Sequence, residues 1–203
     1  MITLSVLIAI VSFRYFSFEP IDLISSKSAQ VRSSIVWQAG FYLHVGLGAL
    51  ALLIGGFQFI SKLRDRFKAL HRTVGKIYVV SVFISAVAGL GIAVFAEGGI
   101  VAKLGFAGLA IAWFYSNYRA YTAIRRVDIS EHREWMIRNF ALTFGAVTLR
   151  LWMPLFLGGF EMKFETAYPI IAWLAWVPNL LIAEMLVRRS RRPSVAQAQP
   201  ATA

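Results

Sequence analysis

The chain has no cysteine and few acidic residues, and both shortages restrict what it can be. Without cysteine, disulfide bonds, thiolate metal sites and cysteine nucleophiles are all excluded. Asp and Glu together number 10 in 203 residues, and charged residues of both signs make up only 15% of the chain. Soluble domains average about 25% charged residues, so the sequence falls outside that class.

Several signatures of catalysis are also missing. The sequence contains no P-loop, no G-x-S-x-G nucleophile elbow and no H-E-x-x-H zinc motif. No pair of acidic residues lies inside a long apolar run. No motif therefore indicates a particular reaction. The candidate residues are instead the polar side chains predicted inside membrane spans, where burying a polar group costs free energy.

Apolar residues are abundant, at 58% of the chain. A helix that crosses a hydrocarbon core of about 30 Å needs about 20 mainly apolar residues. Six stretches meet or approach this length: residues 1–16, 37–60, 74–95, 104–124, 136–159 and 167–187. The sequence predicts an all-α membrane protein, a six-helix transmembrane bundle over residues 1–189, followed by a disordered cytoplasmic tail at 190–203. Pro154 and Pro178 predict kinks in the last two spans.

The basic residues predict the orientation of this bundle. Fifteen Lys and Arg fall in the connections on one side and five on the other, while Arg150 lies inside a span. Because cytoplasmic connections carry the excess of Lys and Arg, both termini are expected in the cytoplasm. The net charge of +11 is divided into short clusters between apolar runs. Such clusters are typical of contact with lipid headgroups and argue against nucleic acid as a partner.

Two ionisable residues are predicted deep in the spans. Placing an ionisable side chain there costs free energy, and such residues usually have a function. His44 lies roughly 10 Å from the outer end of its span, and Arg150 lies at a similar depth in another span. The two are a candidate outer polar site. The alternative is that Arg150 extends toward the surface and His44 hydrogen-bonds to a neighbouring helix.

A second polar layer is predicted at the cytoplasmic ends of the spans. His71-Arg72 and His132-Arg133 each open an outward-running span, so the two histidines are expected at one level. Two imidazoles could ligate the iron of haem b or another metal, and Arg72, Arg133 and Arg138 could hold its propionates. The alternative is that these His-Arg pairs only anchor helix ends. Gln58, Asn117, Arg119 and Glu184 belong to the same layer.

Two strings in the chain, LHRTVGKIY (Leu70–Tyr78) and HREWMIRNFALTFGAVTLR (His132–Arg150), resemble a known family. With His44 and GGFQF (Gly55–Phe59), the region of roughly residues 40 to 155 is similar to a bacterial membrane-protein family, domain-of-unknown-function family 2306. The resemblance implies a multi-span bundle and no particular reaction. Its marked positions would be His44, Gln58, His71, Arg72, Gly75, His132, Arg133, Met136, Arg138 and Arg150.

Three classes of function remain open at this point. The first is a redox or electron-transfer protein of the cytochrome b type, in which His44 and Arg150 would form a quinone or substrate site. The second is a transporter or binder of a small anionic or lipid-like molecule, and a transporter this small would need a homodimer. The third is a structural or assembly role in the membrane.

Overall fold

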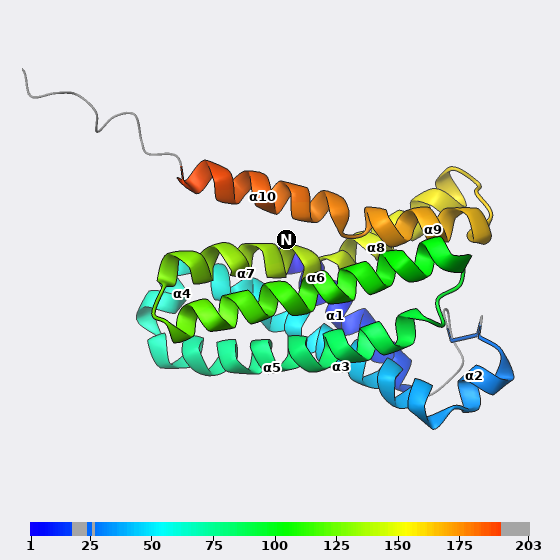
Figure 1. Ribbon diagram of the computed structural model, residues 1–203, viewed down its shortest axis with the longest axis horizontal. Coiled ribbons are helices and arrows are strands. Elements are labelled where there is room, and N and C mark those ends of the chain that lie inside the picture. The colour runs from blue at the N-terminus through cyan, green and yellow to red at the C-terminus, as the bar shows by residue number, and fades with distance from the viewer. Residues whose placement is uncertain (18–23, 26, 192–203) are drawn as a thin grey trace, which may run out of the picture.

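The computed structural model describes residues 1–17, 24, 25 and 27–191, and in this part of the chain every regular element is a helix (Figure 1). The elements are α1 Ile2–Ser12, η1 Phe13–Ser17, α2 Ala29–Ser33, α3 Ile35–Gly55, η2 Gly56–Phe59, α4 Ser61–Arg66, α5 Lys68–Ala93, α6 Gly99–Arg125, α7 Ile129–Thr143, α8 Gly145–Pro154, η3 Leu155–Gly159, α9 Phe164–Leu174 and α10 Val177–Arg191. The all-α prediction is confirmed. Of the predicted tail at 190–203, Ser190 and Arg191 continue α10, and the rest lies outside the described residues.

Five helical segments are long and apolar enough to cross a membrane: Ile35–Phe59, Lys68–Ala93, Gly99–Arg125, Ile129–Gly159 and Phe164–Arg191. They correspond to the last five predicted spans, and three of them extend further into the charged connections. Helical hydrogen bonding continues past the edge of the lipid, whereas an apolar count detects only the lipid-embedded part. As a result, the fourth residues of α5 and α7 are His71 and His132.

The first predicted span is shorter than the others. Helix α1 has 11 residues, which is about 16 Å at 1.5 Å per residue and less than the thickness of a hydrocarbon core. It runs beside α3, since Ile2 contacts Gly56 and Phe16 contacts Gly46. The first apolar stretch therefore forms the helical segment Ile2–Ser17, which packs along α3 as far as Phe41, where the sequence predicted a complete span.

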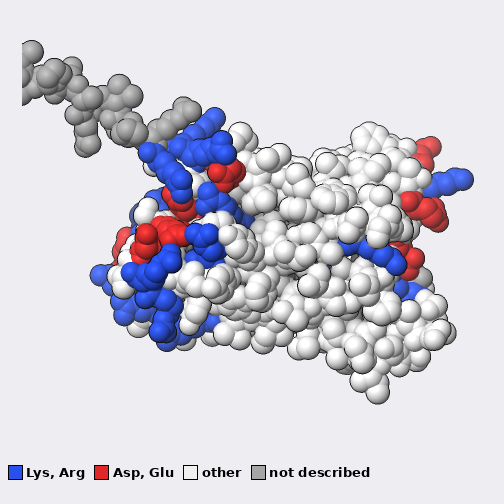
Figure 2. Space-filling view, viewed as in Figure 1, with Lys and Arg blue, Asp and Glu red and all other residues white. Residues whose placement is uncertain are grey.

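Charge divides the molecule into two charged ends and an apolar waist (Figure 2). Most Lys and Arg residues gather at the end formed by α4, the start of α5 and α7, and the last turns of α6 and α10 (Figures 1 and 2). These segments are far apart in sequence, and the prediction put all of them on one side of the membrane. The structure brings them together at one end, called here the basic end.

The centre of the bundle is held by a buried polar network between α5, α6 and α7. The Tyr78 hydroxyl lies 2.7 Å from Asn139 Oδ1 and 2.8 Å from Thr143 Oγ1. Trp113 Nε1 donates to Thr143 Oγ1 at 2.8 Å. Asn139 Nδ2 in turn donates to Trp113 O and Ser116 Oγ. The side chains of this network satisfy one another, so the network joins three helices without an unpaired polar group.

Two of the long segments are interrupted, and the interruptions face each other. The first lies at Phe144, between α7 and α8, and the second at Ala175–Trp176, between α9 and α10. Asn179 Nδ2 donates across the gap to Ala141 O at 3.3 Å. Pro178 accounts for the second interruption, as predicted from the sequence, but the break at Phe144 has no proline. Pro154 instead ends α8, where the π-helical turn Leu155–Gly159 begins.

Candidate functional site

A cavity of about 170 Å³ lies at the basic end, between the last turn of α3, η2, α4 and the start of α5. Most of its lining is apolar: Ile54, Phe57, Leu63, Phe67, Leu70 and Val74. Three polar side chains complete it, from Gln58, Arg64 and His71. The arrangement is typical of a small-molecule site, in which apolar walls supply binding energy and a few polar groups fix the orientation of the ligand.

The local sequence explains why a cavity forms here. Helix α3 ends in Gly55 and Gly56, and a Cβ built on Gly55 would lie 2.6 Å from the Tyr78 ring and 2.9 Å from Phe140. Only glycine allows this approach, which brings η2 against the bundle. The chain then turns through the six-residue helix α4 and returns at Phe67 into α5. The short α4 bridges the two long helices at the end of the bundle (Figure 1).

The polar part of the cavity has unused hydrogen-bonding capacity. Gln58 Oε1 is buried and has no hydrogen-bond partner among the described residues. The His71 ring likewise makes no hydrogen bond within the described part of the chain, whereas Arg64 Nε donates to Asp65 at 3.0 Å near the surface. A buried acceptor without a partner costs about 1–3 kcal/mol. Gln58 Oε1 has almost no accessible surface, so a ligand in the cavity cannot reach this atom unless the amide moves.

His132, the second predicted haem ligand, lies outside this cavity. Its Nδ1 is 2.9 Å from Ala120 O. Since a carbonyl oxygen only accepts, Nδ1 carries the proton, and Nε2 of the neutral ring keeps its lone pair. His71 and His132 are close enough to act on each other electrostatically. They line no common cavity among the described residues.

The three arginines assigned to a cofactor differ in their surroundings. Arg138 lies 2.9 Å from Glu184 and 3.7 Å from Glu134, with its side chain only 11% exposed, and its guanidinium stacks 4.8 Å from the Trp135 ring centre. Arg72 and Arg133 are exposed and make no ion pair with any described residue. Arg138 is therefore part of the protein's own charge network, while Arg72 and Arg133 face the surroundings.

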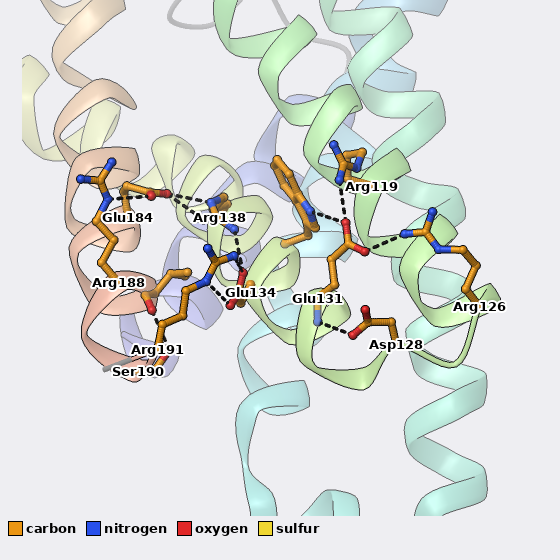
Figure 3. A network of polar contacts seen from close by, with 12 residues as sticks. Arg119, Arg126, Asp128, Glu131, Glu134, Arg138, Glu184, Arg188, Ser190 and Arg191 are labelled. Carbon is orange, nitrogen blue, oxygen red and sulfur yellow. Dashed lines mark hydrogen bonds and ion pairs between the residues drawn. The ribbon is translucent and has the colours of Figure 1, made fainter. Parts of the chain in front are cut away.

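That network joins α6, α7 and α10 at the basic end (Figure 3). Glu131 accepts from Arg119 and Arg126, each at 2.6 Å. Glu184 accepts from Arg188 at 3.0 Å, as expected from their i,i+4 spacing, and also from Arg138.

A third carboxylate extends the same network. Glu134 binds Arg191, so the last turn of α10 is tied to α7. These three glutamates are thus occupied by arginines. Glu131 and Glu134 connect α7 to α6 and to α10, respectively.

The predicted outer pair lies in the waist of the molecule on different helices. His44 Nδ1 donates to Ser85 O at 2.9 Å, and Ser85 Oγ donates back to His44 O at 2.8 Å. A Cβ on Gly89 would lie 2.7 Å from His44 Nδ1, so this glycine makes room for the ring. The two bonds fasten α3 to α5, which is the alternative the sequence left open for His44.

Arg150 points toward α1. It donates to Ala146 O at 3.0 Å and to Ser12 Oγ at 3.1 Å. No hydrogen bond joins it to His44 among the described residues, although its charge acts on the His44 ring electrostatically. The structure therefore brings the pair within electrostatic range and gives each member a separate structural partner.

A haem or metal can be tested against these surroundings. No group of three or more His, Asp or Glu residues that could hold a metal ion occurs in residues 1–17, 24, 25 and 27–191. The cavity beside His71, at about 170 Å³, is smaller than the roughly 300–1,000 Å³ typical of drug-sized and cofactor sites. In this conformation, the cavity does not fit a haem.

The walls of the cavity were missed by the sequence analysis. A strongly basic connection contains or adjoins four of these wall residues, Leu63, Phe67, Leu70 and Val74. Their spacing of four, three and four residues is the pattern of one helix face, and it could have marked an apolar surface inside the connection.

Comparison with known proteins gives one match. The family model described as "Predicted membrane protein (DUF2306)" matches residues 41–187, a region that contains the cavity, all three histidines and the charge network except Arg188 and Arg191. No curated protein and no solved structure matches the chain.

Proposed function

The chain belongs to the DUF2306 family of predicted membrane proteins, and from this premise we propose that it binds a small lipid-like molecule in the cavity at its basic end. The observation that carries the proposal is the lining of the cavity, in which six apolar side chains stand beside three polar ones, from Gln58, Arg64 and His71. An amphipathic ligand suits both features, because its apolar part covers the walls and its polar part binds polar side chains of the lining.

The proposed membrane is the bacterial inner membrane, with both termini and the basic end in the cytoplasm. The gathering of Lys and Arg at one end supports this orientation (Figure 2). Ile2 lies against Gly56, near the basic end, while α3 begins at the opposite end with Ile35. The segment Ile2–Ser17 would therefore make the first of six crossings, even though α1 alone is too short to do so. The cavity would then open at the headgroup level of the inner leaflet, where basic surroundings favour anionic or polar headgroups.

The test is to fill the cavity and analyse what copurifies with the protein. Val74→Trp places a large side chain in the cavity lining, and Val80→Trp places the same side chain on the same helix at a position that is 56% exposed. Organic extracts of equal amounts of detergent-purified protein are compared by mass spectrometry. We expect a small amphipathic molecule near equimolar amounts in the wild type and Val80→Trp, and its loss from Val74→Trp. The same molecules in all three samples would contradict the proposal, and a purely structural role would then be favoured.

A redox function of the cytochrome b type is the second candidate. The bond from His132 Nδ1 to Ala120 O favours it, because metal-binding imidazoles usually donate their other ring N–H in this way. His71 and His132 would hold haem b, with Arg72 and Arg133 near its propionates, and haem would supply one-electron chemistry. Since the cavity does not fit a haem, this candidate needs a different conformation of the basic end. A visible spectrum with a Soret band that disappears in His132→Ala would support it, and wild-type protein with neither a Soret band nor iron would remove it.

A further inference from the structure

The polar groups that a ligand can reach in the cavity are mainly hydrogen-bond donors. Gln58 Oε1 has almost no accessible surface and lies 3.9 Å from the position of a Cβ on Gly75, so it is closed off from the cavity. Nε2 of the same amide makes no hydrogen bond within the described part of the chain and is not among the buried unpaired atoms there, so it keeps accessible surface. Arg64 binds Asp65 through Nε and adds the N–H groups of its two terminal nitrogens. The neutral His71 ring adds one N–H and one acceptor nitrogen.

The cavity lies in a strongly basic segment of the chain. Residues 61–76, which form α4 and the first turns of α5, contain six Lys and Arg residues and one acidic residue, Asp65. Arg64 and Arg72 both act electrostatically on the His71 ring, so positive charge surrounds the polar side of the cavity. A neutral hydroxyl group accepts hydrogen bonds from the same donors but gains nothing from this charge. An anionic group gains from both, because hydrogen bonds to a charged acceptor are roughly twice as strong as those between neutral groups.

The donors come from three different elements, η2, α4 and α5, and this arrangement favours a tetrahedral anion. A phosphate monoester carries a charge of about −1.5 to −2 at pH 7 and has three terminal oxygens, all of them strong acceptors. Gln58, Arg64 and His71 offer one donor group for each of these oxygens. A carboxylate is planar, with two oxygens and a single charge, so it satisfies fewer of the donors and less of the positive charge.

An apolar surface leads from the cavity to the surroundings of the protein. Four of the lining residues are partly exposed: Phe57 37%, Leu63 37%, Phe67 46% and Leu70 52%. Their side chains offer a surface to an alkyl or isoprenoid chain whose headgroup lies at the polar side of the cavity. We infer that the occupant of the cavity is a lipid phosphate, a phosphate monoester on an apolar chain, bound by Gln58, Arg64 and His71. This inference rests on the proposed function and specifies the headgroup of the ligand.

Four probes test the inference on the detergent-purified full chain by isothermal titration calorimetry. Octyl phosphate, octanoate and octanol share one alkyl chain and differ in the headgroup, while inorganic phosphate has the headgroup without the chain. Titration of the same probes into Val74→Trp, in which the cavity is filled, measures their partitioning into the micelles. We expect octyl phosphate to bind about tenfold more tightly than octanol or inorganic phosphate, and at least about threefold more tightly than octanoate.

Two variants locate the binding of the phosphate. Arg64→Gln removes the guanidinium from the lining, and the preference for octyl phosphate over octanol should then fall to about threefold or less. Lys62→Gln is the matched control, because it removes the same charge from the same helix at an exposed position outside the lining. It should keep the wild-type preference. An equal loss in both variants would mean that the general charge of the basic end attracts the phosphate, and it would overturn the site.

The other outcomes separate this inference from the broader proposal. Equal affinity for octyl phosphate and octanol, with both lost in Val74→Trp, would overturn the anionic headgroup and leave the cavity as a site for a neutral lipid. Octanoate that binds as tightly as octyl phosphate would overturn the choice of phosphate. Inorganic phosphate that binds as tightly as octyl phosphate would overturn the role of the apolar chain. Failure of all four probes to bind, together with the absence of any copurified molecule, would remove both proposals.

Discussion

At the scale of the residue, this chain shows what a polar side chain needs inside a bilayer. Lipid supplies no hydrogen-bond partners, so buried polar groups bind one another. Tyr78, Asn139 and Thr143 meet this requirement in the core, and His44 meets it through Ser85. Four buried side-chain atoms of the described residues have no partner: Ser5 Oγ, Gln58 Oε1, Asn117 Oδ1 and Trp176 Nε1. Of these four residues, only Gln58 lines the cavity.

The core network gives the first structural prediction. Tyr78→Phe keeps the buried ring but removes a hydroxyl that contacts Asn139 and Thr143. Hydrogen bonds between helices in membranes average about 0.6 kcal/mol and reach about 1.7. Because two buried partners lose a contact, we expect a loss of about 1–2 kcal/mol in the free energy of unfolding, measured by SDS titration in mixed micelles. Tyr118→Phe, which alters a half-exposed ring, should change it by less than about 0.5 kcal/mol. Equal stability of both variants would show that the network carries little energy.

At the scale of the element, a proline removes a backbone hydrogen bond of its helix, and a side chain of another helix binds the carbonyl left without a donor. Pro178 has no N–H, so it cannot donate to the carbonyl of Leu174, four residues earlier. Trp152 Nε1 donates to this carbonyl instead, at 3.2 Å. The interruption between α9 and α10 is therefore stabilised in part by α8.

This dependence predicts coupling between two distant residues. Trp152→Phe removes the indole N–H and should lower the free energy of unfolding by about 1 kcal/mol. In a Pro178→Ala background, the restored backbone N–H can serve Leu174 O, and the same substitution should cost close to zero. A double-mutant cycle in SDS titrations measures the difference. Equal costs in the two backgrounds would mean that the indole stabilises by packing alone.

At the scale of the whole molecule, charge determines how the bundle lies in the membrane. The basic end carries exposed arginines and lysines, including Arg72 and Arg133, in addition to those paired with Glu131, Glu134 and Glu184. An anionic leaflet attracts such residues by roughly 1 kcal/mol each. The apolar waist between the ends carries little charge on the face seen in Figure 2.

Topology can be measured directly because the chain has no cysteine of its own. Single substitutions Lys62→Cys and Arg125→Cys introduce exposed thiols at the basic end, and Lys163→Cys introduces one before α9. With a membrane-impermeant maleimide, we expect the first two to react only in inverted vesicles and the third only in spheroplasts. Reaction of Lys62→Cys and Arg125→Cys from opposite faces would contradict both the orientation and the shared basic end.

The order of the amino acids alone determined that this chain is helical and apolar enough to cross a membrane several times. Apolar runs of about 20 residues and clustered Lys and Arg are one-dimensional signals, and lipid imposes them on each segment separately. The break at Phe144, the pairing of Tyr78 with Asn139, and the separation of His132 from the cavity were decided by tertiary structure. They depend on which residues of different helices contact one another, and the sequence pattern within a single helix does not predict those contacts. The cavity belongs to the same group, since it exists only because η2 and α4 fold back against α5.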